Sequence, residues 1–367
     1  MIKVLHTADV HLGRRFVGLE GKAAEYRAHL LRTFVRIAEL AELEKVALLL
    51  VAGDLFDTNR LHGVTIERVI SVFRKLDSAR IRVGIVPGVN DAYGEDSIYQ
   101  SMRFPPNVTV FSPERPRYIF DDLGLTVHAP APGEGLAGLA PEERARWNIG
   151  LAHTALQAPG GAGGETTGIS ENDIAGSGLD YLALGSRHNF QDCSRGETRA
   201  GYSGSPEPLE AGSSTGSVAL VTLRGKGSVE VRQVRVGTRQ WEAVTVDVSE
   251  HESPGDVSKL IEARADPNLI LEITLTGQAG LDFHLDCPEI ARALSREFFH
   301  LRLLDQTHPR LDEPKEAAFP EKTVTGRFHR TAGERIAAAG SGEEKELYEA
   351  VLKLGFALLR GRPRALE

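Results

Sequence analysis

The feature that most constrains the fold is an alternation of apolar runs and amphipathic segments over the first 90 residues. Near-continuous apolar runs at residues 3–8, 46–53 and 81–88 predict buried strands. Apolar residues at helical spacing predict helices at residues 26–43 and 65–76. Strand–helix–strand units with such strands indicate a parallel sheet that is covered on both faces.

The pattern changes further along the chain. Residues 148–155 and 179–186 are further apolar runs that predict strands, and residues 217–223 and 229–236 alternate as paired antiparallel strands do. A sheet that opens with parallel strands and closes with antiparallel ones fits an α/β fold, in which a two-layered sandwich is flanked by helices. We expect this first domain to comprise residues 1–240.

Two smaller parts are expected to follow. Residues 241–310 predict a small α+β domain, and residues 311–367 predict a C-terminal segment with a helix at 343–359. The apolar positions of that helix form one stripe, which packs on its own domain or docks a partner; both alternatives remain open. The smaller domain is expected to contain strands at 243–248 and 269–277 and helices at 254–265 and 288–298.

Composition narrows the class of protein. The chain has 41% hydrophobic and 26% charged residues, as ordinary globular proteins do. Cys193 and Cys287 are the two cysteines and lie in unrelated contexts, which argues for a reducing compartment and against a disulfide framework. Met1 leads directly into a strand-like run and no apolar run is long enough to span a bilayer. We therefore expect a cytoplasmic protein with no membrane partner.

Polar residues follow the apolar runs closely. Because the loops at the carboxyl ends of parallel strands converge, these side chains are expected to meet at one edge of the sheet. Carboxylates and imidazoles are ligands for divalent ions, and two such ions can hold a phosphodiester and its attacking water. The residues are Asp9 and His11 in LHTADVHLG, Asp54 and Asp57 in VAGDLFD, Asp91 in PGVND, His153 in GLAHTAL, and Ser186 and His188 in LGSRH.

These motifs, together with YSGSPEPLE at residues 202–210 and TVTGRFHR at residues 323–330, resemble the calcineurin-like metallophosphoesterases. Within that family the chain is most similar to the SbcD and YhaO-like DNA exonuclease branch. The resemblance implies a four-layer αββα sandwich with a small capping domain. It also implies metal-dependent hydrolysis of DNA phosphodiesters, as in a double-strand-break repair nuclease subunit, a homodimer, and a partner that is an SbcC/YhaN-like coiled-coil ATPase of the SMC/Rad type.

By the same resemblance, a first metal ion takes Asp9, His11, Asp54 and His188, all of which are present. Asp54 would bridge to a second ion, which also takes His153. The other two ligands of the second ion are replaced here, because Val89 stands in a GNHD-type turn and Ser186 in a GHxH-type turn. Asn90 replaces the histidine that protonates the leaving oxygen, and an amide cannot serve as a general acid.

Three interpretations of this centre remain open. In the first, one divalent ion, expected to be manganese, binds firmly, the second is weak or absent, and hydrolysis is slow. In the second, the turn slips by one residue so that the Asn90 amide oxygen reaches the second ion. In the third, the centre is a relic and the chain is a non-catalytic DNA-binding or scaffold subunit. A phosphoesterase acting on a small nucleotide is a further alternative.

Four other side chains near the motifs have expected roles. Arg14 and Arg187 are possible phosphate contacts, but a solvated surface arginine is the preferred interpretation of Arg14 and fits Arg187 at least as well as a phosphate contact. We expect Asp57 to cap the helix that follows it and Asp91 to orient its turn.

Overall fold

The computed structural model describes residues 1–130, 135–136, 139–157, 168–213, 216–251, 253–279, 283, 285–309 and 322–359. Contacts between these residues define two compact units. The first unit comprises Met1–Glu242 and Asn268–Ile270, and the second comprises Ala243–Pro267 and Leu271–Glu367. The expected C-terminal segment 311–367 is therefore described only at residues 322–359.

The first unit contains two six-stranded sheets. In the first sheet β1 pairs in parallel with β2, β2 with β3 and β3 with β4, while β11 pairs antiparallel with β1 and β12. The predicted change from parallel to antiparallel pairing is therefore confirmed. The order is β12 (Ser228–Arg235), β11 (Ser217–Gly225), β1 (Ile2–Thr7), β2 (Leu48–Ala52), β3 (Arg82–Val86) and β4 (Val108–Val110).

The second sheet is also mostly parallel in its centre. Strands β6, β7, β8 and β10 run parallel, and β5 and β9 pair antiparallel at the edges. The order is β5 (Arg117–Phe120), β6 (Leu125–His128), β7 (Trp147–His153), β8 (Tyr181–Gly185), β10 (Arg199–Tyr202) and β9 (Gln191–Asp192).

The main core lies between the two sheets. Val4, Leu48 and Leu50 of the first sheet and Trp147 and Ile149 of the second belong to one buried cluster. Leu49, which alternates with Leu48 and Leu50 along β2, is also fully buried. Strands buried on both faces explain why their sequences are continuous apolar runs rather than alternating ones.

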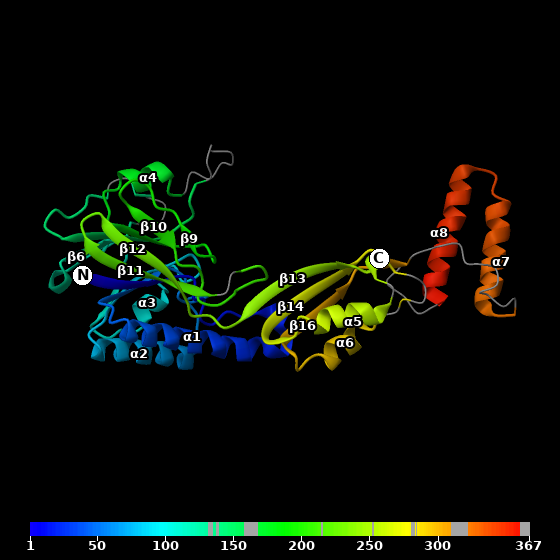
Figure 1. Ribbon diagram of the computed structural model, residues 1–367, viewed down its shortest axis with the longest axis horizontal. Helices are drawn as coiled ribbons and strands as arrows, with labels where there is room; N and C mark the ends of the chain where they lie inside the picture. Colours follow the sequence, from blue (N-terminus) through cyan, green and yellow to red (C-terminus); the bar gives the residue numbers. More distant parts are fainter. Residues whose placement is uncertain are drawn as a thin grey trace. The chain divides into compact units, whose positions relative to one another are not determined.

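Helices cover the outer faces of the sandwich. Figure 1 shows α1 (Ala23–Leu43) and α2 (Gly63–Ser78) on one outer side of this unit and α4 (Glu171–Gly176) on the other. Ile174 of α4 packs with Leu182 and Leu184 of β8 in a second buried cluster. The predicted αββα sandwich is confirmed. The remaining helical turns are η1 (Val17–Lys22), α3 (Ile98–Ser101) and η2 (Asp121–Leu123).

The second unit is built on a three-stranded sheet of order β13–β14–β16 and a two-stranded sheet of β15 and β17. Two helices, α5 and α6, and a helical turn, η3, belong to this α+β part. Its elements are β13 (Gln240–Asp247), η3 (Val248–Glu250), α5 (Pro254–Glu262), β14 (Asp266–Thr276), β15 (Gln278–Ala279), α6 (Cys287–Ala293), β16 (Phe298–Asp305) and β17 (His308–Pro309).

A helical hairpin follows, formed by α7 (Val324–Ala337) and α8 (Gly342–Leu359). The two helices approach closely at Gly355, where an added Cβ would lie 2.0 Å from a ring atom of Phe328. On α8, Leu347, Val351 and Leu358 remain exposed. No helix in the described part of the chain is long and apolar enough to cross a membrane.

One sequence-based expectation for this unit was wrong, and one helix was missed. The helix expected at 288–298 ends at Ala293, and Phe298 instead begins β16, where FFHLRLLD has the aromatic and aliphatic content of a strand. Helix α7 was not predicted. Its two glycines, Gly326 and Gly333, weaken the helical signal, whereas the Thr323 side chain caps it by accepting a hydrogen bond from the Gly326 N–H.

Candidate metal centre

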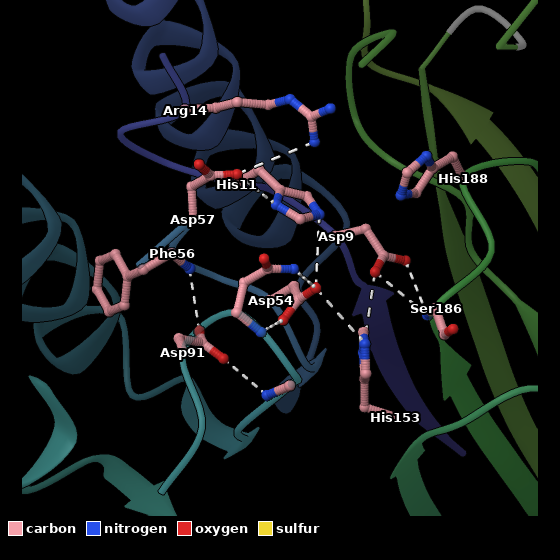
Figure 2. A network of polar contacts seen from close by, with 12 residues as sticks. Asp9, His11, Arg14, Asp54, Phe56, Asp57, Asp91, His153, Ser186 and His188 are labelled. Carbon is pink, nitrogen blue, oxygen red and sulfur yellow. Dashed lines mark hydrogen bonds and ion pairs between the residues drawn. The ribbon is translucent and has the colours of Figure 1, made fainter. Parts of the chain in front are cut away.

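Both sheets of the first unit deliver polar residues to the same edge. The loops after β1, β2 and β3, the end of β7 and the loop after β8 hold every metal-ligand candidate predicted from the sequence. Figure 2 shows the side chains of Asp9, His11, Asp54, His153 and His188 gathered around one place. The residues at this edge are Asp9, His11, Asp54, Asp57, Asn90, His153, Ser186 and His188.

The first two loops are joined through their backbones. The Asp9 N–H donates to the Gly53 carbonyl over 3.1 Å, and the His11 N–H donates to the Asp54 carbonyl over 2.9 Å. Asp9, His11 and Asp54 have φ values of 51°, 48° and 48°, in the left-handed region that side chains other than glycine rarely adopt. Such backbone strain persists only where the surroundings impose it, and it concentrates at functional sites.

Asp9, His11 and His188 form the first group of ligand atoms, which lie within 4.8 Å of one another. The His11 Nδ1 lies 2.9 Å from the Asp57 carboxylate, so the ring donates there and its Nε2 keeps its lone pair. That Nε2 is buried, lies 3.6 Å from Asp54 Oδ2, and finds no hydrogen-bond partner among the described residues. A buried imidazole nitrogen without a partner fits a metal ligand.

Asp9, Asp54 and His153 form the second group within the same distance limit. The His153 Nδ1 donates to the Ala52 carbonyl over 3.0 Å, which leaves its Nε2 3.6 Å from Asp54 Oδ2. Gly53, with φ of 84°, makes room for this ring, because an added Cβ would lie 2.1 Å from the His153 Nδ1. Asp54 therefore lies between His11 and His153, and Asp9 belongs to both groups.

The turn after β3 presents Asn90 to the centre and turns Val89 away. The Asn90 N–H donates to Asp54 Oδ1 over 2.8 Å, and its Nδ2 lies 2.6 Å from Asp54 Oδ2. Val89 is 76% exposed and contributes no ligand atom. Rotation of the Asn90 amide by a half turn exchanges its nitrogen and oxygen, so the same position can offer an oxygen to a cation beside Asp54.

Asp91 orients this turn. Its Oδ1 accepts from the Gly88 N–H over 2.7 Å, and its Oδ2 accepts from the Phe56 N–H over 3.0 Å and from the Tyr99 hydroxyl over 2.5 Å. Burial raises the pKa of Asp91, although these three hydrogen bonds act in the opposite direction. One carboxylate thus ties the loop after β2 to the loop after β3.

Ser186 contributes its backbone rather than its side chain. Its N–H lies 3.2 and 3.1 Å from the two carboxylate oxygens of Asp9, and its φ of 102° places the residue in a strained conformation. The side chain is exposed, so Ser186 orients Asp9 and leaves the imidazole of a GHxH-type turn without a counterpart.

His188 and the two candidate phosphate-binding arginines lie around the rim. The His188 Nδ1 is 3.4 Å from the Glu210 carboxylate. Arg14 lies 3.9 Å from the Asp57 carboxylate and over the Phe16 ring. Arg187 lies over the Tyr202 ring, on the His188 side of the centre.

The electrostatics of the centre favour cation binding. Burial raises the pKa of Asp9 well above its usual value; the Ser186 N–H opposes this shift, and the Asp54 carboxylate adds to it. Burial lowers the pKa of His188, and the neighbouring His11 lowers it further. Two carboxylates crowded in a buried place repel each other, and the lowered pKa of His188 favours the neutral ring that can coordinate a metal, so the residues present fit divalent cations.

Sequence reasoning missed two contacts here. Asp57 does not cap α2, whose N-cap is His62, because its carboxylate instead holds His11. Glu210 was not singled out, although it lies in the YSGSPEPLE motif. In both contacts a carboxylate lies beside an imidazole that is a candidate metal ligand: Asp57 beside His11, and Glu210 beside His188. The sequence does not reveal either pairing, because the two residues of each pair are far apart in it.

Fold and site together define the class of the first unit, which is a metallophosphoesterase domain. Residues 2–176 match the model of the calcineurin-like phosphoesterase family, so the chain carries a domain of that family and the predicted family is confirmed.

The chain is also similar in sequence to proteins that carry a name. The chain is 28% identical over 278 residues to the DNA double-strand break repair protein Mre11 of Aeropyrum pernix, covering 68% of this chain and 64% of the relative. It is 26% identical over 275 residues to the metallophosphoesterase YhaO of Bacillus subtilis, covering 70% and 66%. It is 27% identical over 230 residues to the Mre11 of Methanopyrus kandleri, covering 57% and 49%. The chain therefore spans about half to two thirds of the length of these relatives.

Proposed function

We propose that this chain is a divalent-cation-dependent phosphodiesterase that acts on DNA and turns over slowly on its own. The observation that carries the proposal is the meeting of two ligand groups at one sheet edge, with a buried, unpartnered Nε2 on His11. Two relatives that are named DNA double-strand break repair proteins support DNA as the substrate.

The proposed cation is manganese. Asp9, His11 and His188 would hold one ion, with Asp54 beside them, while Asp9, Asp54 and His153 would hold a second. Mixed carboxylate and imidazole ligands suit Mn²⁺ as well as other divalent ions, so manganese is tested against magnesium, zinc and calcium below. When bound, such ions polarise a phosphoryl oxygen and lower the pKa of water.

Slow turnover is expected because the centre lacks a side chain that can donate a proton to the leaving oxygen. By the resemblance Asn90 stands where a general acid would, and its amide, which contacts Asp54, has no proton to transfer to a leaving oxygen. A well-placed proton donor accelerates such reactions by about 10²–10⁴-fold, and its absence removes that factor. The Asn90 amide beside Asp54 supports the interpretation in which this residue assists the second ion, and the exposed Ser186 side chain does not compensate for a missing imidazole.

The test compares the natural chain with a variant that supplies a proton donor at position 90. Mn²⁺-dependent cleavage of linear duplex and single-stranded DNA is measured for the natural chain, for Asn90→His and, as a control, for Val89→Asn, because Val89 is exposed and faces away from the centre. We expect weak cleavage by the natural chain and by Val89→Asn, and a gain of about 10²-fold or more in Asn90→His. A natural chain that already cleaves as fast as Asn90→His contradicts the impairment, and no Mn²⁺-dependent cleavage by any of them contradicts the enzyme.

A second candidate function is a non-catalytic subunit that docks a coiled-coil ATPase, within a cytoplasmic homodimer. The observation in its favour is the exposed apolar stripe of Leu347, Val351 and Leu358 on α8. The two candidates separate on the double variant Asp9→Asn/Asp54→Asn. Under the scaffold hypothesis this variant retains the function of the complex, whereas under the enzyme hypothesis it loses it.

A further inference from the structure

Trp241, the second residue of β13, packs in the first unit against Phe16, in the loop after β1, and Tyr26 of α1. The Trp241 ring centroid is 6.3 Å from that of Phe16 and 6.2 Å from that of Tyr26, and the Phe16 and Tyr26 rings meet edge to face at 4.7 Å. All three side chains are buried. This aromatic cluster of Phe16, Tyr26 and Trp241 joins the start of β13 to the loop after β1.

Hydrogen bonds hold the aromatic cluster in place. The Tyr26 hydroxyl donates to the Pro208 carbonyl over 2.7 Å. The neighbouring Glu207 carboxylate, which is fully buried, accepts from the N–H groups of Thr238 and Arg239, each over 3.2 Å. The backbone that leads into β13 is therefore fixed to the first unit immediately before Trp241.

Phe16 in turn supports Arg14. The guanidinium carbon of Arg14 lies over the Phe16 ring, 5.7 Å from its centroid. A guanidinium is attracted to an aromatic face by the charge distribution of the ring. Phe16 has a φ of 51°, in the left-handed region, and a side chain of this size keeps such a conformation only where its surroundings impose it. The aromatic cluster therefore determines where the Arg14 guanidinium lies.

The position of Arg14 matters because Asp57 is shared. Figure 2 shows the two contacts of its carboxylate: the same oxygen, Oδ1, lies 2.9 Å from His11 Nδ1 and 3.9 Å from Arg14 Nη1. The longer distance is beyond a hydrogen bond, so the oxygen accepts from His11. An arginine released from the Phe16 ring would be drawn to this carboxylate by opposite charge and would compete with the His11 ring for it.

We propose that Trp241 is a positioning residue of the metal centre. Through Phe16 and Arg14 it keeps the Asp57 carboxylate on His11, and it thereby strengthens the binding of the metal ion. This inference rests on the proposed function for the metal centre itself. Binding influences of this kind are mutual, so a bound ion should also favour the packed position of Trp241. A change in the packing at the start of β13 would then alter how tightly the ion binds.

The test is a set of double-mutant cycles on Mn²⁺ affinity, which isothermal titration calorimetry measures with the full chain. Trp241→Leu is made in the natural chain, in Arg14→Gln and in Asp57→Ala. A residue that acts through Arg14 and Asp57 loses its effect once either is removed, whereas a general loss of stability acts in every background. Thermal unfolding verifies that each variant is folded.

We expect Trp241→Leu to weaken Mn²⁺ binding by about 3–10-fold in the natural chain and by less than about 2-fold in the other two backgrounds. Phe16→Leu removes the support of Arg14 directly and should reproduce the loss, so it replaces Trp241→Leu if that variant does not fold. The matched control is Phe34→Leu, which removes a fully buried ring that packs edge to face on Phe73 and should leave the affinity unchanged.

An equal loss of affinity in all three backgrounds overturns the inference, and so does the same loss in Phe34→Leu or an unchanged affinity in both Trp241→Leu and Phe16→Leu. Failure of the proposed function gives other results. A natural chain that binds no Mn²⁺ overturns both the metal centre and this inference. A natural chain that binds Mn²⁺ with the expected coupling but cleaves no DNA supports this inference and contradicts only the enzyme.

Discussion

His11 shows how a single carboxylate sets the chemistry of a ligand. Its Nδ1 lies 2.9 Å from Asp57, and its Nε2 faces the centre with no partner among the described residues. Carboxylate partners of this kind orient a ligating ring, and their loss usually lowers metal affinity by about 10–100-fold.

We therefore predict that Asp57→Ala binds Mn²⁺ about 10–100-fold more weakly than the natural chain. Isothermal titration calorimetry measures the affinity directly. The control is Asp122→Ala, which removes an exposed carboxylate paired with Arg82. An unchanged affinity in Asp57→Ala shows that His11 does not need this partner.

The burial of Asp9 leads to a second prediction, which concerns how the stability of the folded protein depends on pH. Because burial raises the pKa of Asp9 well above its usual value, the folded protein holds this proton more tightly than the unfolded chain. The contribution of Asp9 to stability is therefore full below that unfolded value and is lost as the pH rises through the raised folded pKa. At neutral pH the proposed cation would offset the charge instead.

Asp9→Asn should accordingly raise the unfolding midpoint of the metal-free protein at neutral pH, by a few degrees. It should also abolish the midpoint increase that Mn²⁺ gives the natural chain. Differential scanning calorimetry at mildly acidic and neutral pH measures both effects, with Glu250→Gln as a surface control. A lower midpoint in metal-free Asp9→Asn contradicts the assignment.

At the scale of elements, the short helix α3 braces the centre. Tyr99 of α3 donates its hydroxyl to Asp91, which in turn accepts from the backbones of Gly88 and Phe56. The Ile98 N–H of the same helix donates to the Asn59 side chain over 3.0 Å. Helix α3 thus fastens the loops after β2 and β3 to each other.

Tyr99→Phe keeps the ring and deletes this hydroxyl. We expect a loss of about 1–3 kcal/mol in unfolding free energy, because the buried Asp91 carboxylate loses one donor. We also expect weaker Mn²⁺ binding, measured by titration calorimetry, because the turn that carries Asn90 loosens. Tyr181→Phe is the matched control, since its buried hydroxyl contacts His6 and not the turn. If both variants weaken Mn²⁺ binding equally, the Tyr99 hydroxyl does not hold the turn that carries Asn90.

The elements also show what sequence can and cannot predict. Strands β1, β2 and β3 were predicted because strands buried on both faces are apolar throughout. The meeting of Asp9, Asp54 and His153 followed from their common position at strand ends, where parallel strands converge. The contact between His11 and Asp57 joins two loops 46 residues apart, and the contact between Tyr99 and Asp91 depends on where a one-turn helix packs. Neither has a periodicity or a spacing that a sequence displays.

The sequence also does not show which side chain of the turn after β3 faces the metal centre. The spacing of Gly88–Asp91 left open whether Val89 or Asn90 faces the ions, because neighbouring residues in a turn point apart and the φ angles that decide this are set by tertiary contacts. The hydrogen bond from the Asn90 N–H to Asp54 decides it in this fold.

At the scale of the whole molecule, the candidate metal centre and the exposed apolar stripe of α8 belong to different units. The metal centre lies in the first unit, where Arg14, Arg15, Arg27 and Arg60 line a pocket beside it. The exposed apolar residues of α8 belong to the second unit. The proposed catalysis and the proposed docking of a partner therefore depend on residues that can be mutated separately.

We predict that Leu347→Glu/Val351→Glu abolishes co-purification with an SbcC/YhaN-like ATPase and leaves Mn²⁺ binding unchanged. Charges on an apolar docking face cost desolvation without a partner charge. Glu346→Gln/Glu349→Gln on the same helix is the control. Retained co-purification in the apolar-face variant excludes this stripe as the docking surface.

Because Asp9 belongs to both ligand groups, the order in which such a centre can lose its ligands during evolution is constrained. Loss of His188 or His153 subtracts from one ion position and spares the other, so drift at the imidazoles passes through one-ion intermediates. Loss of Asp9 would remove a ligand from both candidate positions in a single step. A lineage that is abandoning catalysis gradually should therefore shed its histidines first and keep this aspartate to the end.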